Sequence, residues 1–246
     1  MLKTTICSLA FAGSLFASGD ALCRGKKSLF QPRNASETAD TLTFTNEYDF
    51  YHIQGAQDVN GNPIGNNTLY DNLTLDYSMA NGWDFQIASL NIPYVGGGAQ
   101  NYNLDSYFNL SKTFKVYGPL KAIIGSQNGT VFSGKSEWHN ADYGMAIYQP
   151  SDKINLHVGS YFVDKTLATT TNTVGYTGGF SYHSYGFGVE ADYFSGHNNL
   201  SGANINLFYG GYYVGIVVPE HNSGNEFAGV IGMRKDLSSM LKIFAK

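Results

Sequence analysis

The sequence is short of charge and almost free of cysteine, and both shortages exclude classes of protein. Only 14% of the 246 residues are charged and the formal net charge is −4, which leaves no basic surplus for binding nucleic acid. The two cysteines, Cys7 and Cys23, lie close to the N-terminus, so the rest of the chain cannot form an internal disulfide. The sequence also lacks a P-loop, a helix-opening GxGxxG and metal-ligand spacing among its histidines, and we therefore expect no cofactor and no metal site.

The apolar run near the N-terminus, residues 5–17, is shorter than the ~20 residues that a helix needs to span a bilayer. It follows Lys3 and ends in small residues, which is the pattern of a secretory signal peptide. We predict a signal peptide over residues 1–21, cleaved near residues 19–23. Residues 22–40 are polar and basic without periodicity, which predicts a flexible periplasmic segment ahead of a single domain at 41–246.

Glycine and aromatic residues are abundant, with 29 Gly, 18 Tyr and 16 Phe. This mixture is typical of a β protein rich in turns, whereas a helical bundle would need more Leu, Ala, Glu and Lys. From residue 41 onward apolar and polar residues alternate with a period of two, which predicts twelve strands. Their expected bounds are 41–52, 68–79, 83–94, 103–114, 120–127, 139–148, 154–163, 174–182, 185–194, 203–209, 212–218 and 226–234.

The stretch YGFGVEADYF, residues 185–194, shows the alternation clearly. One face carries aromatic and aliphatic side chains, and the other carries two glycines with Glu190 and Asp192. A membrane barrel explains this pattern, because its strands present apolar residues to lipid and polar residues to the lumen. The same interpretation gives every strand an apolar outer face. In the segment 139–148 this face is formed by Ala141, Tyr143, Met145 and Ile147. In the segment 83–94 it is formed by Trp83, Phe85 and Ile87, followed by a phase shift to Leu90, Ile92 and Tyr94.

Short connections alternate with longer polar ones along the chain. Examples of short links are ANG at residue 80, HS at 183 and GG at 210, and an example of a long one is GAQDVNGNPIGNN. An up-and-down barrel in an outer membrane has short periplasmic turns and longer external loops. We therefore predict an all-β fold, a transmembrane antiparallel up-and-down β-barrel of about twelve strands. A soluble β-sandwich, with its aromatic residues packed inward, is the alternative.

With its export signal, alternating strands and alternating loop lengths, the chain resembles the small Gram-negative outer-membrane β-barrel (porin-like) proteins over residues 41–234. The resemblance implies a location in the bacterial outer membrane, contact with lipid and lipopolysaccharide, and insertion by the outer-membrane assembly machinery. Such proteins typically end in a strand whose last residue is Phe, whereas this chain ends in DLSSMLKIFAK. Leu237, Met240, Leu241 and Phe244 there have helical spacing. The last strand is then either 226–234 followed by a tail at 235–246, or a segment nearer the terminus, and the strand count is twelve or ten.

The face opposite the apolar one carries an excess of acidic residues. In a narrow pore with low-dielectric walls, fixed carboxylates concentrate cations and repel anions. We expect a narrow passive channel for cations or small polar solutes, with inward tyrosines such as Tyr148 and Tyr161 contacting the solute. The predicted pore-lining residues are Glu47, Asp49, Asp76, Asp105, Asp142, Glu190, Asp192, Lys121 and His157.

Aromatic residues near the ends of the outward faces are candidates for interfacial girdles. These residues are Tyr48, Phe50, Tyr77, Trp83, Tyr185 and Tyr193. Two other functions stay open. A lipid hydrolase would use His221 and Ser223, whose spacing of two places them on one face of a strand, although their Asn- and Gly-rich surroundings favour a loop. A structural or adhesive barrel would use its long loops to contact other surfaces.

Overall fold

The computed structural model describes residues 40–52, 67–91, 105–132, 136–164, 173–196, 201–219 and 227–244. These residues form strands followed by one short helix. The elements are β1 (Thr41–His52), β2 (Asn67–Ser78), β3 (Trp83–Asn91), β4 (Asp105–Tyr117), β5 (Leu120–Phe132), β6 (Ser136–Ser151), β7 (Ile154–Val163), β8 (Val174–Ser184), β9 (Phe187–Phe194), β10 (Gly202–Tyr209), β11 (Tyr212–Pro219), β12 (Phe227–Asp236) and α1 (Ser238–Phe244). The predicted signal peptide and nearly all of the predicted periplasmic segment lie outside the described residues.

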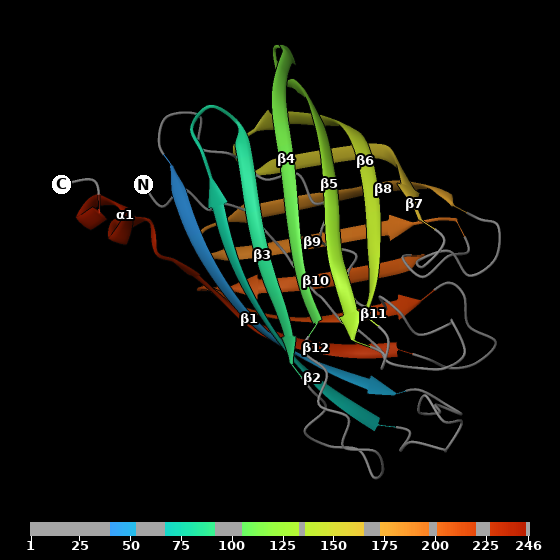
Figure 1. The fold of residues 1–246 in the computed structure, drawn as a ribbon. Helices are drawn as coiled ribbons and strands as arrows, with labels where there is room; N and C mark the ends of the chain where they lie inside the picture. Colours follow the sequence, from blue (N-terminus) through green and yellow to red (C-terminus); the bar gives the residue numbers. More distant parts are fainter. Residues whose placement is uncertain are drawn as a thin grey trace.

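The strands form one closed antiparallel barrel. Each strand pairs with its neighbours in sequence, and β1 also pairs with β12 to close the sheet (Figure 1). Closure removes the free edges that an open sheet would expose. The predicted up-and-down barrel is confirmed, and its strand count is twelve.

The two ends of the barrel differ in the length of their connections. At one end, which we call the turn end, the strands are joined by short links such as Tyr185–Gly186 and Gly210–Gly211, and β1 begins and β12 ends there. Both residues of each link have positive φ, between 51° and 95°, as a two-residue type I′ hairpin turn requires. The predicted link at His183 was wrong by two residues, because β8 continues to Ser184 and Gly186 provides the backbone freedom for the turn.

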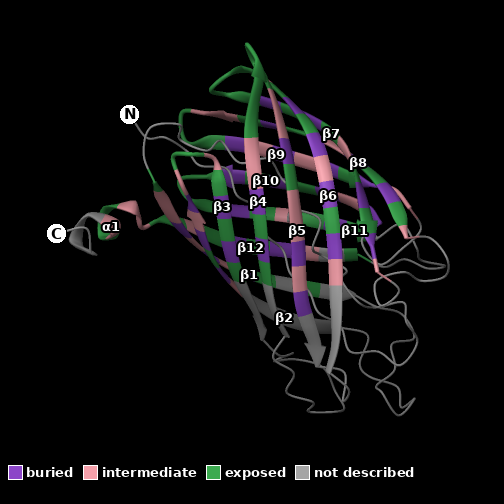
Figure 2. Ribbon diagram, turned by 45° about the horizontal axis from the view of Figure 1, so that its top comes forward, coloured by how far each residue is buried: buried purple, intermediate pink, exposed green. Residues whose placement is uncertain are grey.

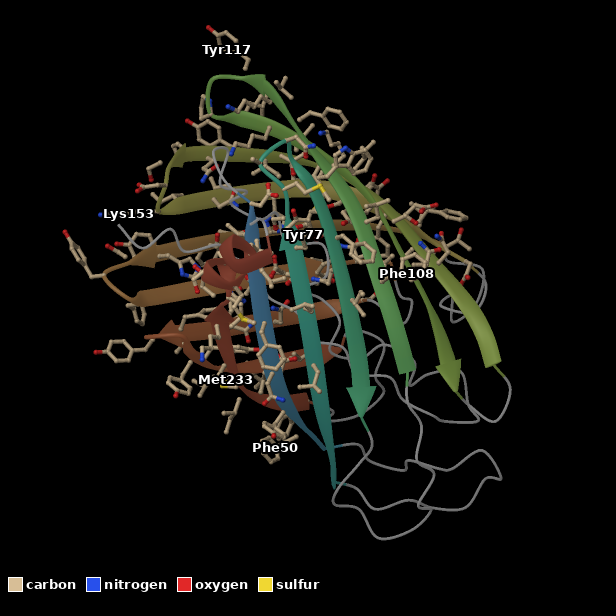
Figure 3. The ribbon with its side chains drawn as sticks, turned by 60° about the vertical axis from the view of Figure 1, so that its left-hand side comes forward. Phe50, Tyr77, Phe108, Tyr117, Lys153 and Met233 are labelled. Atoms are coloured by element: carbon tan, nitrogen blue, oxygen red, sulfur yellow. The ribbon has the colours of Figure 1, made fainter. Side chains whose placement is uncertain are left out.

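Most strands place their apolar side chains outside and their polar side chains inside. Buried and exposed residues alternate along each strand (Figure 2). In β9, for example, Glu190 and Asp192 are buried while Phe187 and Tyr193 are exposed. The side chains labelled in Figure 3, among them Phe50, Phe108 and Met233, project away from the barrel. A soluble sandwich would bury these rings, so this fold is a transmembrane barrel with an apolar outer surface.

Strand β6 reverses the predicted assignment of its faces. Tyr143, Met145 and Ile147 are buried inside the barrel, whereas Asp142 and Tyr148 are exposed on the outside. The pairing of Asp142 with outward Phe162 of β7 agrees with this orientation. The prediction failed because β6 has its larger apolar residues inside, and its outward positions include the small residues Gly144 and Ala146.

The position of Asp142 along its strand explains how a carboxylate can face outward. It is the tenth residue from the turn end of β6. A rise of about 3.4 Å per residue and a tilt near 40° put it about 26 Å from the turns, at the far edge of an apolar band roughly 25 Å tall. Asn140 Nδ2 donates to Asn128 Oδ1 (2.9 Å) and to Ser126 Oγ (3.0 Å) beside it. We expect these outward polar residues to mark the level where the wall leaves the hydrocarbon.

Strand β3 does not contain the predicted phase shift. It pairs with β2 and with β4 without an interruption in register, and it ends at Asn91. Ile92 and Tyr94, which belonged to the shifted phase, lie outside the described residues.

After β12 the chain forms a helical tail, as the spacing of its apolar residues predicted. Helix α1 begins two residues after the end of β12. The Leu237 N–H donates to the Leu42 carbonyl (2.8 Å), and the Leu42 N–H donates to Ser238 Oγ (3.0 Å), which holds the tail against the start of β1. Of the two alternatives for the last strand, the one with an added tail is therefore correct. Within the described ranges, no helix has the length and apolar character needed to cross a bilayer.

Candidate functional site: the inner wall of the barrel

The inner wall carries most of the predicted pore-lining residues. Glu47 (β1), Asp76 (β2), His157 (β7), Glu190 and Asp192 (β9) are all buried on the inner face. Lys121 pairs with inward Ile147 and is intermediate in exposure. Asp142 faces outward, as described above, and the side chains of Asp49 and Asp105 lie outside the described part of the chain.

Two inner-wall residues beside Glu190 were missed by the sequence interpretation. Arg234 follows outward Met233 on β12, and His183 follows outward Tyr182 on β8. Strict alternation predicts both to face inward, so the period-two pattern contained the necessary signal. His183 was missed because it was assigned to a turn, and Arg234 because it lies at the end of its predicted strand.

Both missed residues contact Glu190. His183 Nε2 lies 3.2 Å from Glu190 Oε1, and Arg234 Nη1 lies 3.5 Å from the same oxygen. The Glu190 side chain is fully buried and that of Arg234 is 8% exposed. An ionised group so deeply buried requires a partner of opposite charge, and Arg234 provides it.

Aromatic side chains extend this contact around the barrel wall. The Arg234 guanidinium carbon lies 4.6 Å from the ring centroid of Phe208 and 5.9 Å from that of Tyr213. The two rings lie 4.9 Å apart, and the Tyr213 hydroxyl donates to Glu47 Oε2 (2.7 Å). We call this set the half-ring, since it takes one residue from each of six consecutive strands, β8 to β12 and β1: His183, Glu190, Phe208, Tyr213, Arg234 and Glu47.

A second polar pair lies further along the same wall. His157 Nε2 is 2.9 Å from Asp192 Oδ1, and the Asn204 amide lies at 3.5 Å from Asp192 Oδ2. On the β2–β3 side, Gln86 Nε2 donates to Asp76 Oδ1 (2.7 Å), and Ser78 donates to Asp84. The inner carboxylates are therefore held in defined positions by neighbouring strands.

Some amide oxygen atoms on the inner wall are buried without a hydrogen bond from the protein. Within the described residues, these are Gln127 Oε1, Asn204 Oδ1 and Asn206 Oδ1. The inner wall is therefore polar, whereas the outer surface is apolar.

The inner wall has more acidic than basic residues. The buried carboxylates on it are Glu47, Asp76, Asp84, Glu190 and Asp192. The permanent positive charges on the same face are Lys121, Arg234 and Lys115, which pairs with Lys121. Counted without the histidines, these described charges give the inner wall a net negative charge. No cluster of metal-ligating side chains occurs in the described residues.

The predicted girdle residues lie on the outer surface. Trp83, Tyr77 and Tyr185 are close to the turn end, and Phe50 and Tyr193 are close to the opposite end of their strands. Tyr48 is exposed nearer the middle of β1. Their contact with a membrane interface stays a prediction. His221 and Ser223, the residues of the hydrolase hypothesis, lie outside the described residues.

Comparison with known proteins places the chain among barrels of similar architecture. No protein-family model and no curated protein matches the sequence. Among solved structures, the KdgM porin in complex with disordered oligogalacturonate superposes with a TM-score of 0.51 at 13% identity, covering 78% of this chain and 97% of that one. A triple mutant of the Rhodopseudomonas blastica porin matches with a TM-score of 0.36 at 10% identity, covering 80% of this chain and 100% of that one. The chain thus shares the porin-like outer-membrane β-barrel fold.

Proposed function

We propose that the protein is a narrow passive channel of the bacterial outer membrane, with a preference for cations and small polar solutes. The observation that carries this proposal is an acidic, polar inner wall inside a barrel with an apolar outer surface. Export by the signal peptide at 1–21, contact with lipid and lipopolysaccharide, and insertion by the assembly machinery belong to the same proposal. A porin fold alone does not decide function, so the proposal depends on the chemistry of the wall.

The wall chemistry also bears on the class of solute. The structurally similar KdgM porin was solved with oligogalacturonate, a polyanion. The inner wall of this chain combines five buried carboxylates with the cations Lys115, Lys121 and Arg234. Such a wall repels polyanions, so we propose that this channel passes cations and small neutral polar solutes in preference to acidic oligosaccharides.

The test is the reversal potential of the refolded mature chain in a planar bilayer under a KCl gradient. The protein should conduct and favour K⁺ over Cl⁻. The double variant Glu190→Gln/Asp192→Asn removes two inner carboxylates and leaves Arg234 in place, so its preference for K⁺ should fall. Asp142→Asn is the matched control, because it removes a carboxylate from the outer face and should leave the reversal potential unchanged.

Heat-modifiable migration on SDS gels should first establish that each variant is folded. A folded wild-type protein that never conducts, or that prefers Cl⁻, contradicts the proposed function.

A further inference from the structure

Most of the half-ring stands near the turn end of the lumen, with Glu190 and Glu47 closer to the middle of their strands. Arg234 lies two residues before the end of β12, Glu190 is the fourth residue of β9, and Tyr213 is the second residue of β11. Arg234 and Tyr213 are therefore close to the short links, whereas Glu190 lies near the middle of its strand. A solute that crosses the barrel must pass this layer last or first.

Arg234 connects strands that are not neighbours. It reaches from β12 to Glu190 on β9, with β11 and β10 between them. Three strand spacings correspond to about 14 Å along the wall. The Arg234 and Glu190 side chains together bridge this separation across the curved wall, and the guanidinium lies over the rings of Phe208 and Tyr213, which belong to the two intervening strands. The Arg234–Glu190 pair therefore stands on the lumen side of the aromatic rings and narrows the space inside the wall.

The burial of this layer agrees with a narrow passage. Glu190 is 0% exposed, and Phe208, Tyr213 and Glu47 are all below a tenth exposed. Side chains that lined a wide aqueous lumen would be accessible to water over much of their surface. The half-ring is instead covered, and Arg234 is its permanent cation, in contact with three other members: Glu190, Phe208 and Tyr213.

We infer that Arg234 is the residue that sets the narrowest passage of the channel and the positive charge that a solute meets there. The inference rests on the proposed channel function. In this channel the acidic wall attracts cations. The Arg234–Glu190 pair limits the size of the cations that pass, and the charge of Arg234 lowers the preference of the channel for cations over anions. The solutes that pass are then small hydrated cations and small neutral polar molecules.

The experiment compares single-channel conductance, exclusion of neutral polyethylene glycols and K⁺/Cl⁻ selectivity in the wild type and Arg234→Ala. Loss of the side chain should raise the conductance by about twofold or more and admit larger polymers, since an obstruction at the narrowest layer dominates the resistance of a pore. Selectivity for K⁺ should increase because a lumen cation is removed. Met233→Ala is the matched control: it lies next in sequence, faces outward, and should change none of the three quantities.

Arg234→Ala leaves the buried Glu190 carboxylate without its guanidinium partner, which can impair folding. The double variant Arg234→Ala/Glu190→Gln removes both charges and should show the same gain in conductance and polymer size.

The two proposals fail in different ways. A conducting wild type whose conductance and polymer exclusion are unchanged in both variants overturns the role of Arg234 and leaves the channel intact. A silent wild type with conducting variants supports Arg234 as the obstruction but overturns the open channel. Folded variants that are as silent as the wild type overturn both.

Discussion

Three tyrosines on the inner wall lie over a glycine of the next strand and form a hydrogen bond beyond it. Tyr213 of β11 covers Gly232 of β12 and donates to Glu47 of β1. Tyr143 of β6 likewise covers Gly125 and donates to Asn109 of β4 (3.0 Å), and Tyr161 of β7 covers Gly175 and donates to the Ser195 carbonyl. Glycine is required at these inward positions because a neighbouring tyrosine ring occupies the space that a side chain would fill.

This arrangement predicts the effect of adding one methyl group. In Gly232→Ala, the new Cβ collides with the Tyr213 ring, which must shift and lose its hydrogen bond to Glu47. We expect a loss of about 1–3 kcal/mol in the free energy of unfolding, typical of overpacking. The measurement is urea unfolding in lipid vesicles, followed by heat-modifiable gel migration.

Gly229→Ala is the control for that experiment. Gly229 lies on the outward face of the same strand, where a Cβ would meet no atom within 4 Å. It should unfold like the wild type. Equal destabilisation of the two variants would show that any replacement of glycine in β12 lowers the free energy of unfolding and that the contact with Tyr213 is not the cause.

At the turn end, Asp40 predicts a pH-dependent contribution to stability. The Tyr77 hydroxyl donates to Asp40 Oδ2 (2.5 Å) and the Ala80 N–H donates to Asp40 Oδ1 (2.9 Å), and these two hydrogen bonds lower the pKa of the Asp40 carboxyl. Because the pKa of this carboxyl is lower in the folded than in the unfolded state, the ionised carboxyl stabilises the fold at pH values above the unfolded-state pKa of about 3.9. This contribution is lost as the pH falls through the folded-state pKa. Because Asp40 is exposed, we expect Asp40→Ala to cost only about 0.5 kcal/mol at pH 7.

The difference between Asp40→Ala and the wild type should shrink as the pH is lowered below 4, which urea unfolding over a pH series would measure. Asp152→Ala, in the exposed β6–β7 turn, is the control. A difference that stays constant down to the lowest pH would contradict the role of the ionised carboxyl.

Among the strands, the alternation of side chains predicted most outward faces correctly and failed on β6. The pattern succeeds where large apolar residues face lipid, as in β7 and β9. It fails on β6 because Tyr143 and Met145 fill the inside over Gly125 and Gly159 of the adjacent strands. Alternation shows that a strand has two faces, but which face is inside depends on these cross-strand contacts, which a single sequence does not contain.

Strand β5 provides a test of where the membrane ends. Ile124 and Asn128 both face outward and are the fifth and ninth residues of the strand. With the rise and tilt used above, they lie about 13 Å and 23 Å from the turns, near the middle and at the edge of the apolar band. Ile124→Arg should lower the free energy of unfolding in vesicles by about 2–4 kcal/mol, and Asn128→Arg by about 1 kcal/mol or less.

The comparison between these two arginine variants is internal, because both lie on one face of one strand. If Asn128→Arg cost as much as Ile124→Arg, the Ser126–Asn128–Asn140 network would lie inside the hydrocarbon, and its assignment as the membrane edge would be wrong.

At the scale of the whole molecule, the sequence predicted the barrel, its twelve strands and the acidic character of its interior. The sequence pattern did not contain the pairing of Glu190 with Arg234 or of Asp192 with His157, because these partners lie on strands that are not neighbours and are brought together by the curvature of the sheet. Glu190 and Arg234, for example, are separated by two intervening strands. The net charge of the inner wall can therefore be predicted from the residues on its strands, whereas the positions of its ion pairs depend on how the strands are arranged in the barrel.

That distribution leads to a prediction about solutes. Because the buried inner carboxylates outnumber Lys115, Lys121 and Arg234, entry has an electrostatic cost for an acidic solute that is absent for a neutral solute of equal size. In a liposome-swelling assay, galactose should enter faster than galacturonate, and the ratio should decrease at high ionic strength as the wall charge is screened. In the Glu190→Gln/Asp192→Asn variant the two rates should converge, while Asp142→Asn should keep the wild-type ratio. Faster entry of galacturonate in the wild type would mean that Arg234, and not the carboxylates, dominates the potential along the path of the solute.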